Sequence, residues 1–136
     1  MEWMLMPLRR YADFSGRSRR KEYWMFVLFV GLVSVALSLV LTMLGLSADE
    51  EGSLFGVGGA MLIIVLLFIL AMIIPAIAVQ VRRFHDQDKS GWFVLLNLIP
   101  YRGGIIVFVF ICLDGTRGPN RYGPDPKGGA SEEIFA

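Results

Sequence analysis

Two long apolar stretches limit what this chain can fold into more than any other feature. No Asp, Glu, Lys or Arg occurs within residues 23–46 or 57–79. As a helix, each stretch would extend about 35 Å, more than the roughly 30 Å hydrocarbon core of a bilayer. The first is also longer than the apolar region of a signal peptide, about 7 to 15 residues. We therefore expect an uncleaved anchor followed by a second full transmembrane helix.

The composition also favours a lipid environment. Hydrophobic residues make up 55% of the chain and charged residues 18%, against about 45–50% and about 25% in soluble domains. The net charge of +1 provides no overall field that would attract nucleic acid. A single cysteine, Cys112, excludes an intramolecular disulfide. We expect an all-α integral membrane protein with one domain at residues 1–127 and a disordered tail at 128–136.

A third apolar segment, residues 92–113, is interrupted at its midpoint by the sequence from Pro100 to Gly104. Neither half could cross a bilayer alone, so the segment forms either one broken span or a re-entrant hairpin. A hairpin tip would leave irregular backbone at mid-depth without water, and we therefore favour one broken span packed against the other two. Arg102 would then be a polar residue within the membrane, in need of a carbonyl, a water or an acidic partner.

The basic residues predict the orientation. Six precede the first apolar stretch, whereas the turn at 47–56 is purely acidic and the turn at 80–91 is again basic. Because cytoplasmic loops carry the excess of Lys and Arg, we expect the N-terminus in the cytoplasm. Residues 1–14 mix apolar side chains with Arg9 and Arg10, so they form either a short interfacial helix or a disordered arm.

The two basic stretches form a candidate site for an anion, a lipid headgroup or a protein partner. Arginines beside a helix N-terminus favour phosphate, and an anionic leaflet attracts each basic residue by about 1 kcal/mol. The alternative is that these residues only fix the topology. The candidate residues are Arg17, Arg19, Arg20, Lys21, Arg82, Arg83, His85 and Asp86.

The charged stretch "QVRRFHDQDKSGW" contains no evident catalytic or metal site. Neighbouring His85 and Asp86 would not face each other on a helix, whereas Arg82 and Asp86 are spaced to form an ion pair. His85 and Asp88 would supply only two metal ligands, and the chain has no other histidine. Ser90 is better explained as a helix cap than as a nucleophile. We expect neither a metal nor another cofactor.

Three motifs in order, "FSGRSRRKEYWMF", "VQVRRFHDQDKSGWFVLLNLIP" and "GPNRYGPDP", resemble the YhaH-like family of small bacterial inner-membrane proteins. The chain departs from the family pattern at Phe84, where Leu is usual, and at Tyr101-Arg102, where the family has an apolar pair. The resemblance implies a multi-pass protein of the bacterial inner membrane and brings no established activity. The matching positions are Gly16, Arg17, Arg19, Arg20, Arg82, Arg83, His85, Asp86, Gly91, Trp92, Asn120, Arg121, Tyr122 and Gly123.

Three functions are compatible with these features. We favour a non-enzymatic module that binds anionic lipid or other membrane proteins, a second copy of the chain included, through the basic cytoplasmic face. The alternative is a component of an oligomeric transporter or channel, since Arg102 interrupts a membrane segment and three spans are too few to enclose a pathway. A third hypothesis is an enzyme that uses His85 and Asp86 for proton transfer.

Overall fold

The computed structural model describes residues 2–43 and 57–127. The last residues of the first predicted span (44–46), the acidic turn at 47–56 and the predicted disordered tail at 128–136 therefore lie outside the described residues. Within the described part, the chain is helical apart from turns and one isolated β-bridge between Asn120 and Gly123. The elements are α1 (Glu2–Arg9), α2 (Arg20–Met43), α3 (Val57–Asp86), the 3₁₀ helix η1 (Gly91–Leu98) and α4 (Arg102–Cys112).

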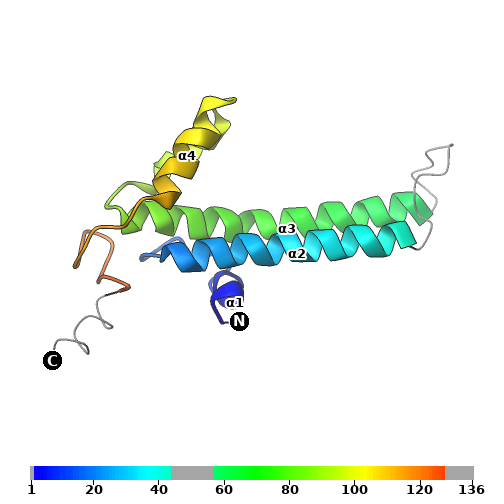
Figure 1. The fold of residues 1–136 in the computed structure, drawn as a ribbon, viewed down its shortest axis with the longest axis horizontal. Coiled ribbons are helices and arrows are strands. Elements are labelled where there is room, and N and C mark those ends of the chain that lie inside the picture. Colours follow the sequence, from blue (N-terminus) through cyan, green and yellow to red (C-terminus); the bar gives the residue numbers. More distant parts are fainter. Residues whose placement is uncertain (1, 44–56, 128–136) are drawn as a thin grey trace.

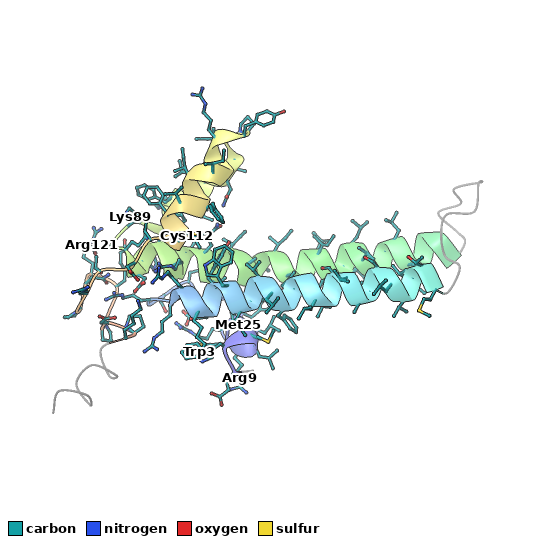
Figure 2. All side chains as sticks on the ribbon, viewed as in Figure 1. Trp3, Arg9, Met25, Lys89, Cys112 and Arg121 are labelled. Carbon is teal, nitrogen blue, oxygen red and sulfur yellow. The ribbon has the colours of Figure 1, made fainter. Side chains whose placement is uncertain are left out.

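Helices α2 and α3 lie side by side along the long axis of the molecule (Figure 1). Both are long and apolar enough to cross a membrane. Their side chains stand out from the pair along most of its length (Figure 2), and Leu39 and Leu67 are 59% and 60% exposed. Exposed apolar surface on this scale suits lipid and not water. The prediction of a helical membrane protein is confirmed.

Helix α3 continues well past the end of the second predicted span at residue 79. It ends at Asp86, and every residue from Val81 to Gln87 is buried. The charged stretch expected to be a turn at 80–91 is therefore helical as far as Asp86, and the turn itself occupies only residues 87–90. Ser90 caps η1 as predicted, since its hydroxyl accepts a hydrogen bond from the Trp92 backbone N–H.

The third apolar segment is a hairpin, so the expectation of one broken span at 92–113 was wrong. Helices η1 and α4 pack against each other and lead away from the end of α3 and back to it (Figure 1). Tyr101 makes the turn with a φ of 64°, and the Arg102 N–H bonds to the Pro100 carbonyl at 2.8 Å. A Cβ on Gly103 would lie 1.7 Å from the Leu96 carbonyl oxygen. Gly103 thus allows η1 and α4 to pack closely together. We attribute the hairpin to this packing, which offsets the cost of irregular backbone at its tip.

The N-terminal segment is helical at α1, as one of the two alternatives anticipated, and it packs against α2 and α3. Beyond α1, the Tyr11 hydroxyl donates a hydrogen bond to the Ala71 carbonyl at 2.5 Å. That carbonyl lacks its usual helical partner because Pro75, four residues later, has no N–H. Tyr11 therefore satisfies a backbone acceptor that the proline leaves unpaired within an apolar helix.

Candidate functional site

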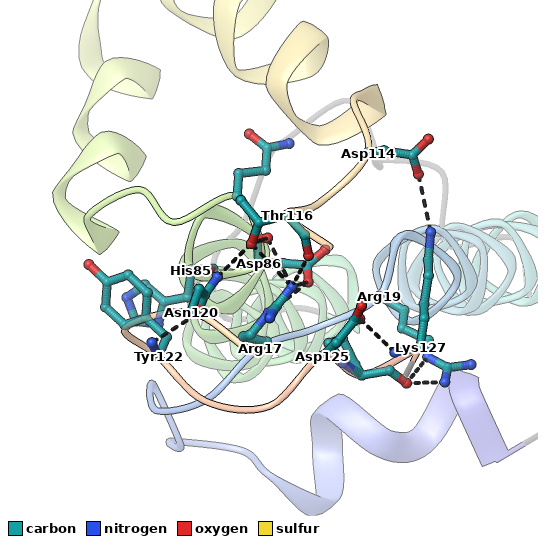
Figure 3. Close-up of polar contacts among 12 residues, drawn as sticks. Arg17, Arg19, His85, Asp86, Asp114, Thr116, Asn120, Tyr122, Asp125 and Lys127 are labelled. Carbon is teal, nitrogen blue, oxygen red and sulfur yellow. Dashed lines mark hydrogen bonds and ion pairs between the residues drawn. The ribbon is translucent and has the colours of Figure 1, made fainter. Parts of the chain in front are cut away.

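Five charged side chains gather where α2 begins and α3 ends, and they form the polar clasp: Arg17, Glu22, Arg82, Arg83 and Asp86. All five are buried, and the fractions exposed range from 0% for Arg82 to 8% for Arg17. Buried charges persist in proteins only when they are paired and hydrogen-bonded. The neighbouring segments that meet the polar clasp are the loop before α2, the base of the hairpin and the tail after α4 (Figure 3).

Asp86 is the centre of the polar clasp. Its carboxylate accepts a hydrogen bond from Arg17 Nε at 3.0 Å and a second from Arg83 Nη1. Its backbone carbonyl accepts the Thr116 N–H at 2.7 Å. A Cβ on Gly115 would lie only 2.0 Å from Asp86 Oδ2, so glycine is needed for this close approach. Asp86 thus joins the N-terminal loop, α3 and the tail.

Arg17 extends this junction to the tail, as the dashed lines in Figure 3 show in part. Its guanidinium donates to the carbonyls of Thr116 at 2.6 Å and Gly118 at 2.7 Å. Arginine suits this position because its planar donors can meet a carboxylate and several carbonyls together. The tail is therefore tied to the loop before α2, at the same end of the molecule.

Side chains of α2 and α3 donate hydrogen bonds to the carbonyls at the C-terminus of α4. The last carbonyls of a helix have no partner within it and carry partial negative charge. Arg83 donates to the carbonyls of Ile111 and Leu113, and Arg20 donates to that of Cys112. Gln87 donates to the carbonyl of Phe110. These cationic and amide donors fix the returning helix of the hairpin to α2 and α3.

Arg82 pairs with Glu22 on α2, with Nη2 and Oε1 3.1 Å apart. The prediction that Arg82 pairs with Asp86 is therefore wrong, because Asp86 forms its ion pairs with Arg17 and Arg83. The Arg82 carbonyl also accepts the Ser18 N–H at 3.1 Å. Within the described residues, Nε and Nη1 of Arg82 and the hydroxyl of Ser18 have no hydrogen-bond partner.

His85 is buried beside the polar clasp, where its ring stacks on that of Tyr122 with centroids 3.8 Å apart and planes 2° from parallel. Its Nδ1 lies 3.1 Å from the Gly16 carbonyl oxygen, and its own carbonyl accepts the Asn120 amide at 2.9 Å. His85 and Asp86 therefore face different partners and form no proton-transfer pair with each other. The contacts give His85 a role in holding the tail against the N-terminal loop.

A second set of basic side chains lies outside the polar clasp. Arg19 and Lys21 both lie over the ring of Trp3, with cation to ring-centroid distances of 5.5 and 5.4 Å. Arg19 also donates to the Pro126 carbonyl at 2.6 Å. Lys21 and Arg9 are exposed. We call Arg9, Arg19 and Lys21 the basic rim.

Acidic side chains of the loop and tail are held in their charged form. Hydrogen bonds from Ser15 and Arg10 lower the pKa of Asp13. A hydrogen bond from the Lys127 side chain, and its charge, lower the pKa of Asp114, which also pairs with Arg20 at 2.6 Å. The Lys127 backbone N–H lowers the pKa of Asp125. Electrostatic contacts therefore continue from the polar clasp to the surface of the tail.

The other predicted residues are not brought to the polar clasp. Arg102 is the first residue of α4 and lies exposed at the hairpin tip, and no described acidic side chain pairs with it. The feature that motivated a transporter thus lies on the hairpin, away from the α2–α3 contact. Among residues 2–43 and 57–127, no group of three or more His, Cys, Asp or Glu could hold a metal ion.

Sequence reasoning missed three contributors to this site: Glu22, Gly115 and Thr116. Glu22 could have been noticed as the acidic residue directly before the first apolar stretch, where a charge at the membrane boundary needs a partner. Gly115 and Thr116 lie in a turn-rich tail that gave no comparable signal, since their contacts depend on where the hairpin returns.

Comparison of the sequence with known proteins shows which family the chain resembles. A protein-family model described as "Protein of unknown function (DUF805)" matches residues 11–124. The chain is 47% identical to "Inner membrane protein YhaH" of Escherichia coli (strain K12), over 93% of this chain and 98% of that protein. It is 40% identical to "Inner membrane protein YhaI" of the same strain, over 96% of this chain and 100% of that protein. No solved structure matches the chain.

Proposed function

The chain belongs to the family described as "Protein of unknown function (DUF805)", and we propose that it is a non-enzymatic inner-membrane module that binds anionic lipid headgroups through the basic rim. The resemblance drawn from the three motifs is confirmed by this membership and by the two inner-membrane relatives. The observation that carries the proposal is the position of Arg19 and Lys21 around Trp3, beside helices that could cross a membrane.

The orientation is part of the proposal. The basic N-terminal loop and the basic end of α3 lie together, and the tail is tied to both through Arg17. The positive-inside rule then puts this whole end, with the N-terminus and the described tail, in the cytoplasm. Anionic lipids are enriched in the cytoplasmic leaflet, where each nearby basic residue contributes about 1 kcal/mol.

Of the eight candidate residues, a headgroup could reach Arg19, Arg20 and Lys21. Arg20 is engaged by Cys112 and Asp114, so the basic rim combines Arg19 and Lys21 with the exposed Arg9, which lies outside the eight. Arg82 and Arg83 are buried and engaged within the polar clasp, as are Arg17 and Asp86. Arg19 and Arg20 are half-buried and Lys21 is exposed. Aromatic rings such as that of Trp3 favour the membrane–water interface, which positions the neighbouring cations at headgroup depth.

Native mass spectrometry of the purified chain in mixed micelles tests the proposal. We expect phosphatidylglycerol to be retained over phosphatidylethanolamine, with a preference that declines as salt rises. The double variant Arg9→Glu/Lys21→Glu should lose this preference. Arg117→Glu, an exposed change of equal sign on the tail, is the control and should retain more of it.

Equal retention of both lipids by the wild-type chain would reject lipid binding by the basic rim, and so would an unchanged preference in the double variant. A reporter fused to each terminus tests the orientation separately. Periplasmic activity of the N-terminal fusion would reject the proposed topology.

A further inference from the structure

The hairpin is too short to cross a bilayer and is attached at one end of the molecule only. Helix α4 extends about 16 Å, and η1, a 3₁₀ helix, extends about 16 Å as well. The roughly 30 Å hydrocarbon core is nearly twice as thick. Both the start of η1 and the end of α4 lie at the polar clasp, where Arg83 and Gln87 hold the α4 carbonyls.

The hairpin presents apolar side chains around most of its surface. Leu98 is 78% exposed, and Ile105, Phe108 and Trp92 are also exposed. Between Gly91 and Cys112, Asn97 and Arg102 are the conspicuous polar side chains. A surface of this kind in water would be a large exposed hydrophobic patch. Lipid is the occupant that its composition fits.

Contacts at the base show that this surface continues the lipid-facing surface of the long helices. Trp24 on α2 meets Phe108 on α4 edge to face, with centroids 5.9 Å apart. Asn97 on η1 donates to the Gln80 side chain on α3 at 2.9 Å. The base of the hairpin therefore packs against the last turns of α3, and its tip stands away from the long helices and leans toward their apolar end (Figure 1).

The two ends of the molecule consequently differ in cross-section. At the polar clasp, α1 and the hairpin lie beside α2 and α3 (Figure 1). Toward the other end, the described residues comprise α2 and α3 alone. If both long helices cross the membrane, the leaflet at the polar clasp accommodates more helices than the opposite leaflet does.

We propose that the hairpin inserts into the leaflet at the polar clasp and makes the protein a one-sided wedge, whose partner is a phospholipid leaflet with loosened packing. A leaflet on the convex side of a curved membrane has such packing, because its headgroups are spread apart. The protein thus prefers membranes that are convex on the side of the polar clasp. This inference requires no anionic lipid, and it goes beyond the function proposed for the basic rim.

The position of the hairpin is tested with a spin label in phosphatidylcholine vesicles. The label is attached at Leu98→Cys in a Cys112→Ser background, and Leu39→Cys on α2 provides a lipid-exposed reference. We expect the label at 98 to be relaxed by oxygen and protected from a water-soluble nickel chelate, as at 39. Access by the chelate would place the hairpin in water, and protection from both would mean a protein contact such as a second copy. Either result would overturn the inference.

The curvature preference is tested by reconstituting the unlabelled chain into small sonicated and large extruded phosphatidylcholine vesicles. The chain carries an N-terminal tag, which marks the end of the molecule where the polar clasp lies. A protease added outside the vesicles cleaves only outward-facing tags and so reports the fraction of chains with the polar clasp outward. We expect this fraction, relative to the inward one, to be several-fold higher in the small vesicles. Equal ratios in the two vesicle sizes would overturn the inference.

A double variant tests whether the curvature preference depends on the apolar surface of the hairpin. Leu98→Asp/Ile105→Asp places charge on its exposed apolar surface and should remove most of the enrichment in small vesicles. If the variant does not fold, the wild-type comparison still decides the inference. Because the vesicles carry no anionic lipid, failure here leaves binding by the basic rim intact, and failure of the mass-spectrometric test leaves the wedge intact.

Discussion

The long helices expose apolar side chains, whereas the polar clasp buries charged ones, which is the opposite of the pattern in a soluble protein. Leu39 and Leu67 on the long helices are more than half exposed, whereas Arg82 and Arg83 are almost fully buried. In lipid, apolar side chains gain little by leaving the surrounding acyl chains for another helix, so burial of leucine does not specify how the helices meet. Buried charges have few acceptable partners, and they therefore select one arrangement of the loop, α3, the hairpin and the tail.

The strongest test of this contrast removes one charge from the polar clasp. Asp86→Asn keeps the shape of the side chain but leaves Arg17 and Arg83 buried without their carboxylate. We expect the free energy of unfolding in detergent to fall by about 3–5 kcal/mol, because a broken buried ion pair leaves an uncompensated charge. Thermal unfolding of the purified variant measures the loss.

Asp88→Asn is the matched control, made two residues further along the chain. Asp88 pairs with Arg121 at an exposed site, and asparagine tolerates its positive φ of 57°. Exposed pairs contribute little to stability. Equal losses at positions 86 and 88 would contradict the central role of the polar clasp.

A second test perturbs the apolar hairpin without adding charge. Gly103→Ala would place a Cβ 1.7 Å from the Leu96 carbonyl oxygen, so η1 and α4 must separate. We expect a loss of about 1–3 kcal/mol, as for other overpacked contacts. At the neighbouring Gly104, a Cβ would have no atom within 4 Å. Gly104→Ala should therefore leave the unfolding temperature nearly unchanged, and similar losses at both positions would argue against the hairpin.

A third test concerns the hydrogen bond that Tyr11 makes to the apolar part of α3. Tyr11→Phe removes the donor to the Ala71 carbonyl and should cost about 0.5–1.5 kcal/mol. In a Pro75→Ala background, residue 75 regains an N–H that can reach this carbonyl. The cost of Tyr11→Phe should then shrink, and a double-mutant cycle measures the difference. An equal cost in both backgrounds would show that the proline does not create the need for Tyr11.

The smallest effect is expected for the exposed contacts of the tail. Asp114 and Asp125 have pKa values lowered below 3.8, so they favour the docked tail above that pH and lose this effect as the pH falls through their lowered pKa values. Amide hydrogen exchange within 113–127, normalised at each pH to a free peptide of that sequence, should stay slow down to about pH 4 and become faster below it. Release of the tail nearer neutrality would contradict this assignment.

The sequence predicted the long helices because their signal is local. The absence of charge over 23–46 and 57–79 bounds the two spans with no knowledge of tertiary contacts. Helix α2 begins three residues before the first predicted span, and α3 extends seven residues past the second. The prediction ended the second span at the first charged residues. At residues 80–86 the loop before α2 and the tail bury and pair these charges, so the helix continues to Asp86.

The hairpin and the polar clasp could not be predicted in the same way. The length of 92–113 is compatible with a broken span and with a hairpin, and the close approach of Gly103 to Leu96 that decides between them is a tertiary contact. Helical spacing suggested Asp86 as the partner of Arg82, whereas Glu22 is 60 residues away in the chain. Local spacing predicts which pairs are available, and long-range packing decides which of them form.

The long range of these contacts has a consequence for synthesis of the protein. Arg17 reaches the Thr116 carbonyl across 99 residues, and Arg83 reaches Ile111 across 28. While the ribosome is still making the tail, both arginines lack acceptors that they have in the finished chain. Closure of this end therefore waits until the hairpin and the tail have been synthesised. Chains truncated before Ile111 would retain both apolar helices and the carboxylate of Asp86, but both arginines would lack these carbonyl acceptors.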